Sequence, residues 1–317
     1  MNDVTTWLMD SDPAIRWQVL RDLEDAPSAQ VAAERAQVAE TGWGKRLLDL
    51  QSDGQWAGGA CFPSRDWRVS GPVVGDPEGQ PWTATLPTLR LLHAFGIDPA
   101  ARVVRAALAG VRENSHWEYN GEPFFDGEVE PCINGGTVTL GAYFGENVDK
   151  IVSRLVGEQL DDGGWNCEAE NGSTRSSFHS TICVLEGLLD YERAGGEIPV
   201  ELARRRAEEY LLSRRLLRRA STGEVVDPDW LQFSFPVQWH YDVLRGLEYF
   251  RSVGGMPDPR LAEAMQQVRD RRQSDGRWLL ENTHPGLIYF ELEDGDGRPS
   301  RWNTLRALRI LRWYDGR

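Results

Sequence analysis

The chain has 317 residues, of which 40% are hydrophobic, and a formal net charge of -14. This acidic balance argues against nucleic acid and anionic membrane surfaces as partners, because both attract basic proteins. Thirteen tryptophans are ample for a large core, yet no run approaches the roughly 18 apolar residues of a membrane span. The N-terminus lacks the basic and apolar regions of a signal peptide. We therefore expect a soluble, cytoplasmic protein without a membrane span.

Lysine and cysteine usage narrows the chemistry further. Lys45 and Lys150 are the only lysines, which argues against a mechanism that needs a Schiff-base lysine. The four cysteines show no short, regular spacing of the kind found in secreted disulfide scaffolds. They are Cys61, Cys132, Cys167 and Cys183.

The sequence of residues 1–42 predicts short helices without the repeating pattern of the rest of the chain. Asp12 followed by Pro13 is typical of a helix cap and first turn, and apolar residues at helical spacing follow it. A second helix is expected from about Ser28 to Glu40. We interpret residues 1–42 as an N-terminal helical extension packed on the main body.

Residues 43–317 contain recurring turns that end on a tryptophan, spaced by roughly 50 to 60 residues. The turns are Gln51–Trp56, Asn114–Trp117, Gln159–Trp165 and Gln273–Trp278, with Val226–Trp230 as a weaker copy. An amphipathic helix precedes each turn and a second helix follows it. The second helices are expected to start near Trp82, Asn134, Ser177, Pro236 and Trp302. About five such helical hairpins predict an all-α fold in which the hairpins form a closed or nearly closed ring without a sheet.

The turns Gln51–Trp56, Gln159–Trp165 and Gln273–Trp278 share a Gln, a Gly and a final Trp. This pattern resembles the QW repeat of the terpenoid cyclase and protein prenyltransferase superfamily, the squalene cyclase-like α/α toroids. The resemblance covers Trp43 to the C-terminus and implies that these Gln and Trp residues are scaffold, with the Gln amide bridging helix ends. It also implies an enzyme, either a transferase or a cyclase.

The stretch Asp161–Tyr191 holds a Gly-rich turn, a polar loop and then an amphipathic helix. Ser176 or Ser177 can cap this helix, and His179 lies one or two residues inside its start. Prenyltransferase beta subunits carry an Asp-x-Cys motif at the start of one inner helix and a His at the start of the next. Glu130-x-Cys132 followed by His179 is similar to that arrangement.

The resemblance implies a metal site, with zinc the expected cofactor. Cys132 would be the thiolate ligand, His179 the imidazole and Glu130 the replacement for the Asp, with Cys167 as a further ligand. The structural alternative is that Cys132 is a small buried hydrophobic residue. His179 would then be a helix-start residue bonded to a loop carbonyl.

Other candidates lie at the expected starts of the inner helices, which ring the mouth of a toroid's central cavity. The cavity-lining candidates are Trp82, Asn134, Trp239, Trp302 and Asn303; alternatively, the tryptophans plug the ring. Class II terpene cyclases protonate an alkene with an Asp from a DxDD motif, which this chain lacks. Asp242 beside His240 is the candidate acid/base pair in its place.

Our hypothesis is a metal-binding, prenyltransferase- or terpene cyclase-like enzyme that acts on a hydrophobic, isoprenoid substrate in the central cavity. The resemblance makes a partner subunit or a homodimer a candidate assembly. One alternative is a non-catalytic toroid that binds a small molecule or a protein partner. Another is an (α/α) barrel glycoside hydrolase-like activity, in which two carboxylates flank the scissile bond. Its candidates are Glu118, Asp126 and Glu128.

Overall fold

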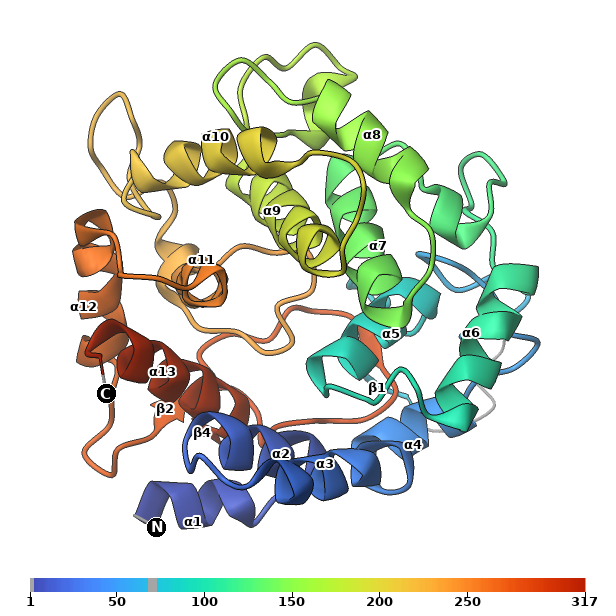
Figure 1. The fold of residues 1–317 in the computed structure, drawn as a ribbon, viewed down its shortest axis with the longest axis horizontal. Coiled ribbons are helices and arrows are strands. Elements are labelled where there is room, and N and C mark those ends of the chain that lie inside the picture. The colour runs from blue at the N-terminus through green and yellow to red at the C-terminus, as the bar shows by residue number, and fades with distance from the viewer. Residues whose placement is uncertain (1–2, 68–72, 317) are drawn as a thin grey trace. The chain divides into compact units, whose positions relative to one another are not determined.

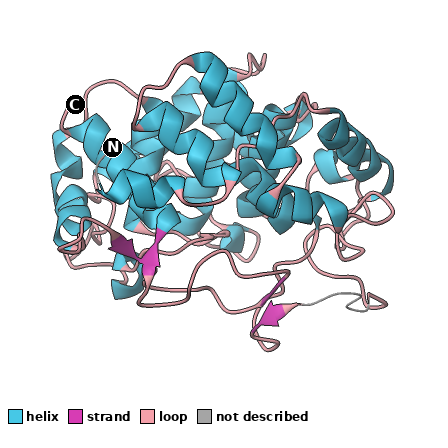
Figure 2. Cartoon of the chain, turned by 90° about the horizontal axis from the view of Figure 1, so that it is seen from below, coloured by secondary structure: helices cyan, strands magenta, loops and turns pink. Residues whose placement is uncertain are grey.

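A computed structural model describes residues 3–67 and 73–316, and regular structure within them is almost entirely helical (Figure 2). The α-helices are α1 (Asp3–Met9), α2 (Pro13–Asp22), α3 (Ser28–Ala36), α4 (Gly42–Asp49), α5 (Thr85–Ala94), α6 (Arg102–Asn114), α7 (Pro131–Phe144), α8 (Asp149–Gly157), α9 (Phe178–Arg193), α10 (Glu201–Leu212), α11 (Val243–Val253), α12 (Ala262–Asp270) and α13 (Arg301–Tyr314). The 3-10 helices are η1 (Gln37–Ala39), η2 (Phe124–Asp126), η3 (Cys167–Ala169), η4 (Pro228–Leu231) and η5 (Pro259–Leu261). The predicted all-α class is confirmed.

Four two-residue strands are the exception to the helical pattern in the described ranges. They are β1 (Val74–Gly75), β2 (Trp278–Leu279), β3 (Leu287–Ile288) and β4 (Pro299–Ser300). Strand β1 pairs with β3 and β2 with β4, both antiparallel. The expectation of no sheet is therefore corrected by these two pairs, which join loop segments and form no layer of the core.

The chain divides into two compact units. Unit 1 comprises Met1–Phe124 with Gln273–Leu305, and unit 2 comprises Phe125–Arg272 with Arg306–Arg317. Within unit 2, helix α7 packs on α9 and α9 on α11, while α8, α10 and α12 pack on α7, α9 and α11 respectively (Figure 1). Helices α7 and α9 are buried on most of their surface, whereas α8 and α12 bury one stripe. Unit 2 therefore shows the predicted two-layer hairpins; their closure into a ring stays a prediction.

Two glycines allow α7 and α9 to approach each other closely. A Cβ atom on Gly135 of α7 would lie 2.5 Å from the carbonyl carbon and oxygen of Cys183 in α9. A Cβ atom on Gly187 of α9 would lie 2.4 Å from the Gly135 carbonyl oxygen. Since real Cβ atoms do not come this close to backbone atoms, both positions require glycine at this helix spacing. The contact brings the N-terminal ends of α7 and α9 together.

The N-terminal helices pack on the rest of unit 1 through hydrogen bonds to one helix end. The Trp17 indole N–H donates to the Phe95 carbonyl at 2.8 Å, and the Arg35 guanidinium donates to the Gly96 carbonyl at 2.7 Å. Asp12 caps α2 as predicted, accepting from the Ala14 amide at 2.9 Å. The domain boundary expected at residue 42 stays a prediction.

The tryptophan turns hold helix ends together. The indole N–H of Trp165 donates to the Leu155 carbonyl at the end of α8, at 2.7 Å. The amide of Gln159 donates to the Ala203 carbonyl in α10, also at 2.7 Å. In unit 1 the Trp56 indole and the Gln51 amide repeat this arrangement on the carbonyls of Leu47 and Ala107. These side chains are therefore scaffold.

A threonine in the first turns of the following helix fixes each of these turns. The backbone N–H groups of Trp56, Trp165 and Trp278 donate to threonine hydroxyls at 3.2, 3.1 and 3.0 Å. The accepting residues are Thr85, Thr181 and Thr304.

One predicted helix start is wrong. Helix α11 begins at Val243, not near Pro236, because Asp242 supplies the N-cap and its carboxylate accepts from the Arg245 amide at 2.6 Å. Trp239 and His240 consequently lie in the loop before α11. Within residues 3–67 and 73–316, no helix combines the length and apolarity that crossing a bilayer requires.

Candidate metal centre

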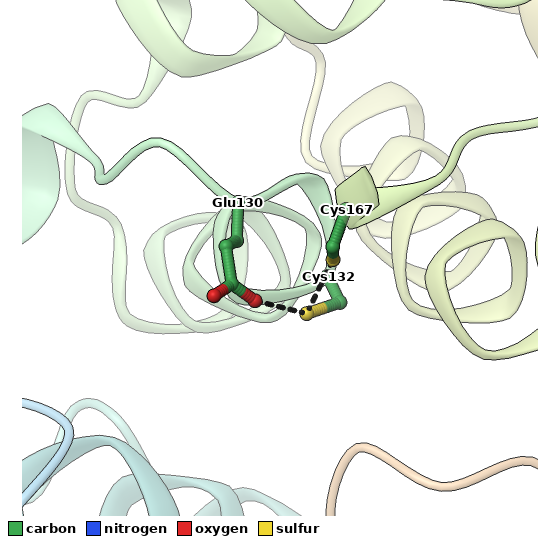
Figure 3. Close-up of side chains that lie close together, drawn as sticks. All are labelled: Glu130, Cys132 and Cys167. Carbon is green, nitrogen blue, oxygen red and sulfur yellow. Dashed lines mark hydrogen bonds between the residues drawn. The ribbon is translucent and has the colours of Figure 1, made fainter. Parts of the chain in front are cut away.

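Three side chains of the kinds that ligate metals meet at the start of α7. The donor atoms of Glu130, Cys132 and Cys167 all lie within 4.8 Å of one another. Glu130 and Cys132 come from the first turn of α7, and Cys167 reaches them from the segment that precedes α9 (Figure 3). The Sγ atoms of Cys132 and Cys167 are 3.1 Å apart, and the Cys132 Sγ is 3.4 Å from a Glu130 carboxylate oxygen. None of the four cysteines is in a disulfide.

The loop that carries Glu130 is clamped from two sides. Asn134 accepts from the Glu128 amide at 2.8 Å and donates to the Glu128 carbonyl at 2.7 Å. Arg154 of α8 donates to the carbonyls of Glu128 and Val129 at 2.7 and 3.0 Å. Pro131 opens α7 without losing a helical hydrogen bond, since the first amides of a helix have none. The backbone of the Glu130 loop is thus fixed before any ligand binds.

Cys167 is held by the first turn of α9. Its backbone N–H donates to the Ser180 hydroxyl at 3.3 Å, and its Sγ lies 3.3 Å from the same oxygen. The neighbouring Asn166 caps η3 by accepting from the Glu168 amide at 3.0 Å. Ser180 is a site residue that sequence analysis missed. Its position directly after the candidate ligand His179, at a predicted helix start, is the sequence feature that could have identified it.

The two thiols differ in their affinity for a proton. The hydrogen bond with Cys167, together with burial, raises the pKa of Cys132 far above its usual range. The same hydrogen bond lowers the pKa of Cys167, and the Ser180 hydroxyl acts in the same direction. Cys167 is also the more exposed of the two. The pair therefore loses its first proton from Cys167, while Cys132 beside the Glu130 carboxylate keeps its own.

The donor set fits a zinc ion. Two thiolates and a carboxylate are ligands that zinc accepts, and three protein ligands leave one position open, as in catalytic zinc sites. Two sulfurs on a tetrahedral zinc with Zn–S bonds of about 2.3 Å are about 3.8 Å apart. The observed separation of 3.1 Å must therefore widen modestly on metal binding. Binding would also release the thiol protons.

His179, predicted as the imidazole ligand, is not a member of this group. Its Nδ1 accepts a hydrogen bond of 2.8 Å from the backbone N–H of Tyr241. An unprotonated Nδ1 places the proton of the neutral ring on Nε2, which then has no lone pair for a metal. Burial lowers the pKa of His179 to about 4, and the nearby Arg245 guanidinium adds to this effect. The ring is therefore neutral, and its partner is a loop amide.

His179 belongs instead to an aromatic group with Trp239 and His240. The His240 ring stacks on Trp239 with centroids 3.8 Å apart, and His179 meets Trp239 edge-on at 5.4 Å. All three side chains are only half-buried. His179 is followed directly in sequence by Ser180, the residue that holds Cys167.

Asp242, the predicted proton donor, is 3% exposed and caps α11. Its carboxylate accepts from the amides of Arg245 and Ser234 at 2.6 and 3.3 Å and lies 3.9 Å from the Arg306 guanidinium. Burial raises its pKa, and Arg306 opposes that rise. These contacts give Asp242 a structural role at the start of α11. Its part in acid/base chemistry with His240 stays a prediction.

Arg245 positions the loop that carries the aromatic group, and sequence analysis did not identify it. Its guanidinium pairs with both Glu186 carboxylate oxygens, at 2.8 and 2.6 Å. It also donates to the His240 carbonyl at 2.6 Å and approaches the Cys183 sulfur to 3.4 Å. A buried arginine in an apolar helix face is the sequence signal for such a role.

The remaining cavity-lining candidates make hydrogen bonds or ring contacts with other residues. Asn134, fully buried, is the clamp described above. In unit 1, Trp302 stacks on Phe95 with centroids 5.8 Å apart, and the Asn303 amide donates to the Leu279 carbonyl at 3.1 Å. The Trp82 indole donates to the Pro285 carbonyl at 3.2 Å. Whether any of these residues lines a cavity stays a prediction.

The carboxylates considered for glycoside hydrolysis each have a local partner. Glu118 accepts from the backbone amides of Cys61 and Phe62, at 3.0 and 3.1 Å. Asp126 pairs with Lys150 at 3.0 Å, and Glu128 accepts from the Glu130 amide at 2.7 Å. No observation singles out two of them as a catalytic pair.

No protein-family profile and no curated protein matches the chain. The solved structures that are similar to it include the following two. One is the type II terpene cyclase MstE from Scytonema, in an apo variant form, which is 18% identical with a TM-score of 0.41 over 97% of this chain and 84% of its own. The other is a protein from Actinoplanes, 17% identical with a TM-score of 0.45 over 95% of this chain and 90% of its own. Likenesses at this level carry no argument about function, and the all-α class rests on the helices themselves.

Proposed function

We propose that the chain is a zinc-dependent enzyme of the prenyltransferase or terpene cyclase kind that acts on a hydrophobic, isoprenoid substrate. The observation that carries the proposal is the group formed by Glu130, Cys132 and Cys167 at the start of α7. A zinc ion bound there would act as a Lewis acid or lower the pKa of a bound water. Of the four ligands expected from sequence, the proposal keeps Glu130, Cys132 and Cys167 and leaves out His179.

The chain's own residues prepare this site for a cation. Asn134 and Arg154 fix the loop before Cys132, and Ser180 fixes Cys167. Ligands that are already held in place lose little conformational freedom on binding, which favours affinity. The exposed Glu130 leaves one side of the group open to solvent and to a substrate.

The hydrophobic substrate class rests on the sequence resemblance and on the aromatic group. The rings of His179, Trp239 and His240 are half-buried, and His179 directly precedes Ser180, the residue that holds Cys167. Aromatic faces of this kind suit apolar hydrocarbon and electron-poor carbon centres. His179 is neutral at physiological pH, so it adds no charge to this surface.

The test is zinc stoichiometry in purified protein, followed by ligand-dependent melting. We expect one zinc per chain by elemental analysis, lost in Cys132→Ala and in Cys167→Ala. Cys61→Ala is the matched control, because Cys61 belongs to unit 1 and lies outside the group. His179→Asn should also keep the metal. A wild-type protein that takes up no zinc would refute the metal centre.

An isoprenoid diphosphate should raise the melting temperature of the zinc-loaded protein, as any ligand that binds only the native state does. If a saturating concentration of the diphosphate leaves the melting temperature unchanged, the proposed isoprenoid substrate class is wrong. Zinc uptake without that shift would favour the alternative of a non-catalytic binding protein.

A further inference from the structure

The sulfur atoms of Cys132 and Cys167 are placed for a second kind of chemistry. Their separation of 3.1 Å lies between a disulfide bond of about 2.05 Å and the roughly 3.8 Å expected on a shared tetrahedral zinc. The side chains come from different elements and are 35 residues apart in sequence, so the contact is made by the fold. A modest movement in one direction closes a covalent bond, and a modest movement in the other opens a metal site.

The other two cysteines are engaged elsewhere. Cys183 lies against the Trp239 carbonyl at 3.6 Å and the Arg245 guanidinium at 3.4 Å. Cys61 is buried in unit 1, where its amide donates to Glu118. Among the described residues, the sulfur-to-sulfur contact of Cys132 with Cys167 is therefore the one that favours a specific disulfide.

The two thiols have the unequal exposure that a stepwise exchange needs. Cys132 is 8% exposed, whereas Cys167 is half-buried and has the Ser180 hydroxyl beside its sulfur. A small disulfide from solution therefore reaches Cys167 first. Cys132 is then already in contact with the sulfur that it must attack.

We propose that Cys132 and Cys167 form a reversible disulfide that switches the metal centre off. The oxidant is a small-molecule disulfide of the glutathione type. The Cys167 thiolate attacks it and releases one glutathione thiolate. Cys132 then gives up its thiol proton as its sulfur attacks the Cys167 sulfur, and the second glutathione leaves. Both thiol protons end on the two glutathione molecules, which carry away the two electrons. The loss of metal binding rests on the function proposed above, while the disulfide itself does not.

The experiment exposes metal-free and zinc-loaded wild-type protein to glutathione disulfide and maps peptides without reduction. We expect a single cross-link between Cys132 and Cys167 that dithiothreitol reverses. In the zinc-loaded protein it should form at least ten-fold more slowly and release one zinc per cross-link, read with a chromogenic chelator. Cys61→Ala should behave as wild type, and Cys132→Ala should stop at a glutathione adduct on Cys167.

The outcomes separate the two proposals. A protein that binds zinc but forms no cross-link, or forms mixed cross-links through Cys61 or Cys183, overturns the disulfide. A reversible cross-link in a protein that never binds zinc supports the disulfide and refutes the metal centre, and with it the switching role. Both readouts use the wild-type chain, so neither depends on the folding of a variant.

Discussion

At the scale of single residues, polar side chains around the candidate metal centre mostly bind main-chain groups. Asn134, Ser180 and His179 each direct a polar atom at a backbone amide or carbonyl of another segment. An unsatisfied buried amide costs more than the hydrogen bond itself contributes, so these side chains are hard to replace. They fix where the thiols lie without being ligands themselves.

His179 allows this to be tested through pH. In His179→Leu the buried Tyr241 amide loses its acceptor, which should lower the free energy of unfolding by about 1–3 kcal/mol. In His179→Asn the side-chain oxygen stands where Nδ1 was, so the bond persists without a titrating group. In urea denaturation at neutral pH, His179→Asn should therefore have a higher free energy of unfolding than His179→Leu.

The difference between wild type and His179→Asn should change with pH. The folded imidazole has a pKa of about 4, below the usual value of about 6.5 of an unfolded histidine. Between these values the unfolded state binds more protons, so wild-type stability falls as the pH falls. Relative to His179→Asn, the loss should reach at most about 3 kcal/mol by pH 4. Parallel stability curves for the two proteins would contradict the buried, neutral ring.

At the scale of elements, the contact between α7 and α9 determines whether the site forms. Gly135→Ala places a Cβ atom 2.5 Å from backbone atoms of Cys183, so the helices must separate. Overpacking of this kind costs about 1–3 kcal/mol. It should also weaken zinc binding, since Cys132 lies on α7 and Ser180, which holds Cys167, lies on α9.

Gly157→Ala is the matched control, because Gly157 is also helical and its added Cβ atom meets nothing within 4 Å. Helix propensity predicts that this change is neutral or stabilises by up to about 1 kcal/mol. Urea denaturation and zinc titration of both variants check the expectation. Equal effects at the two positions would mean that the close approach of α7 and α9 is not required.

Sequence patterns predicted the elements better than the directions of side chains. The Asp12–Pro13 pair correctly predicted α2, and the tryptophan turns correctly predicted the helices on either side of them. Both predictions succeeded because caps and turn residues act on their immediate neighbours in sequence. Glu130 and Cys132 were identified as candidates for the same reason, because they lie at the predicted start of a helix, which the structure shows as α7. The partner of His179 is a loop amide 62 residues further on, and no local pattern encodes it. Asn134 was expected to line a cavity, yet its amide is committed to the loop six residues earlier.

At the scale of the whole molecule, the excess of negative charge sets how the protein responds to salt. Exposed ion pairs such as Lys45–Asp49 and Arg154–Glu158 are typically worth about 0.3–0.5 kcal/mol, and salt weakens them. The net charge of -14 has the opposite effect, because like charges in the folded chain repel one another. Two like charges 10 Å apart in water repel by about 0.4 kcal/mol, and 14 uncompensated charges form many such pairs. We therefore expect the repulsion to destabilise the folded state by more than the exposed ion pairs stabilise it.

We accordingly expect the protein to become more stable when salt is raised at neutral pH. At about 0.02 M salt the screening length is more than 20 Å, and at about 0.2 M it falls below 10 Å, which removes most of the repulsion. The free energy of unfolding, from urea denaturation at pH 7.5 with NaCl, should increase by on the order of 1 kcal/mol. The increase should vanish near pH 5, close to the isoelectric point of about 4.9, because the excess charge is gone there. A decrease with salt at pH 7.5 would mean that the ion pairs contribute more than the net charge costs.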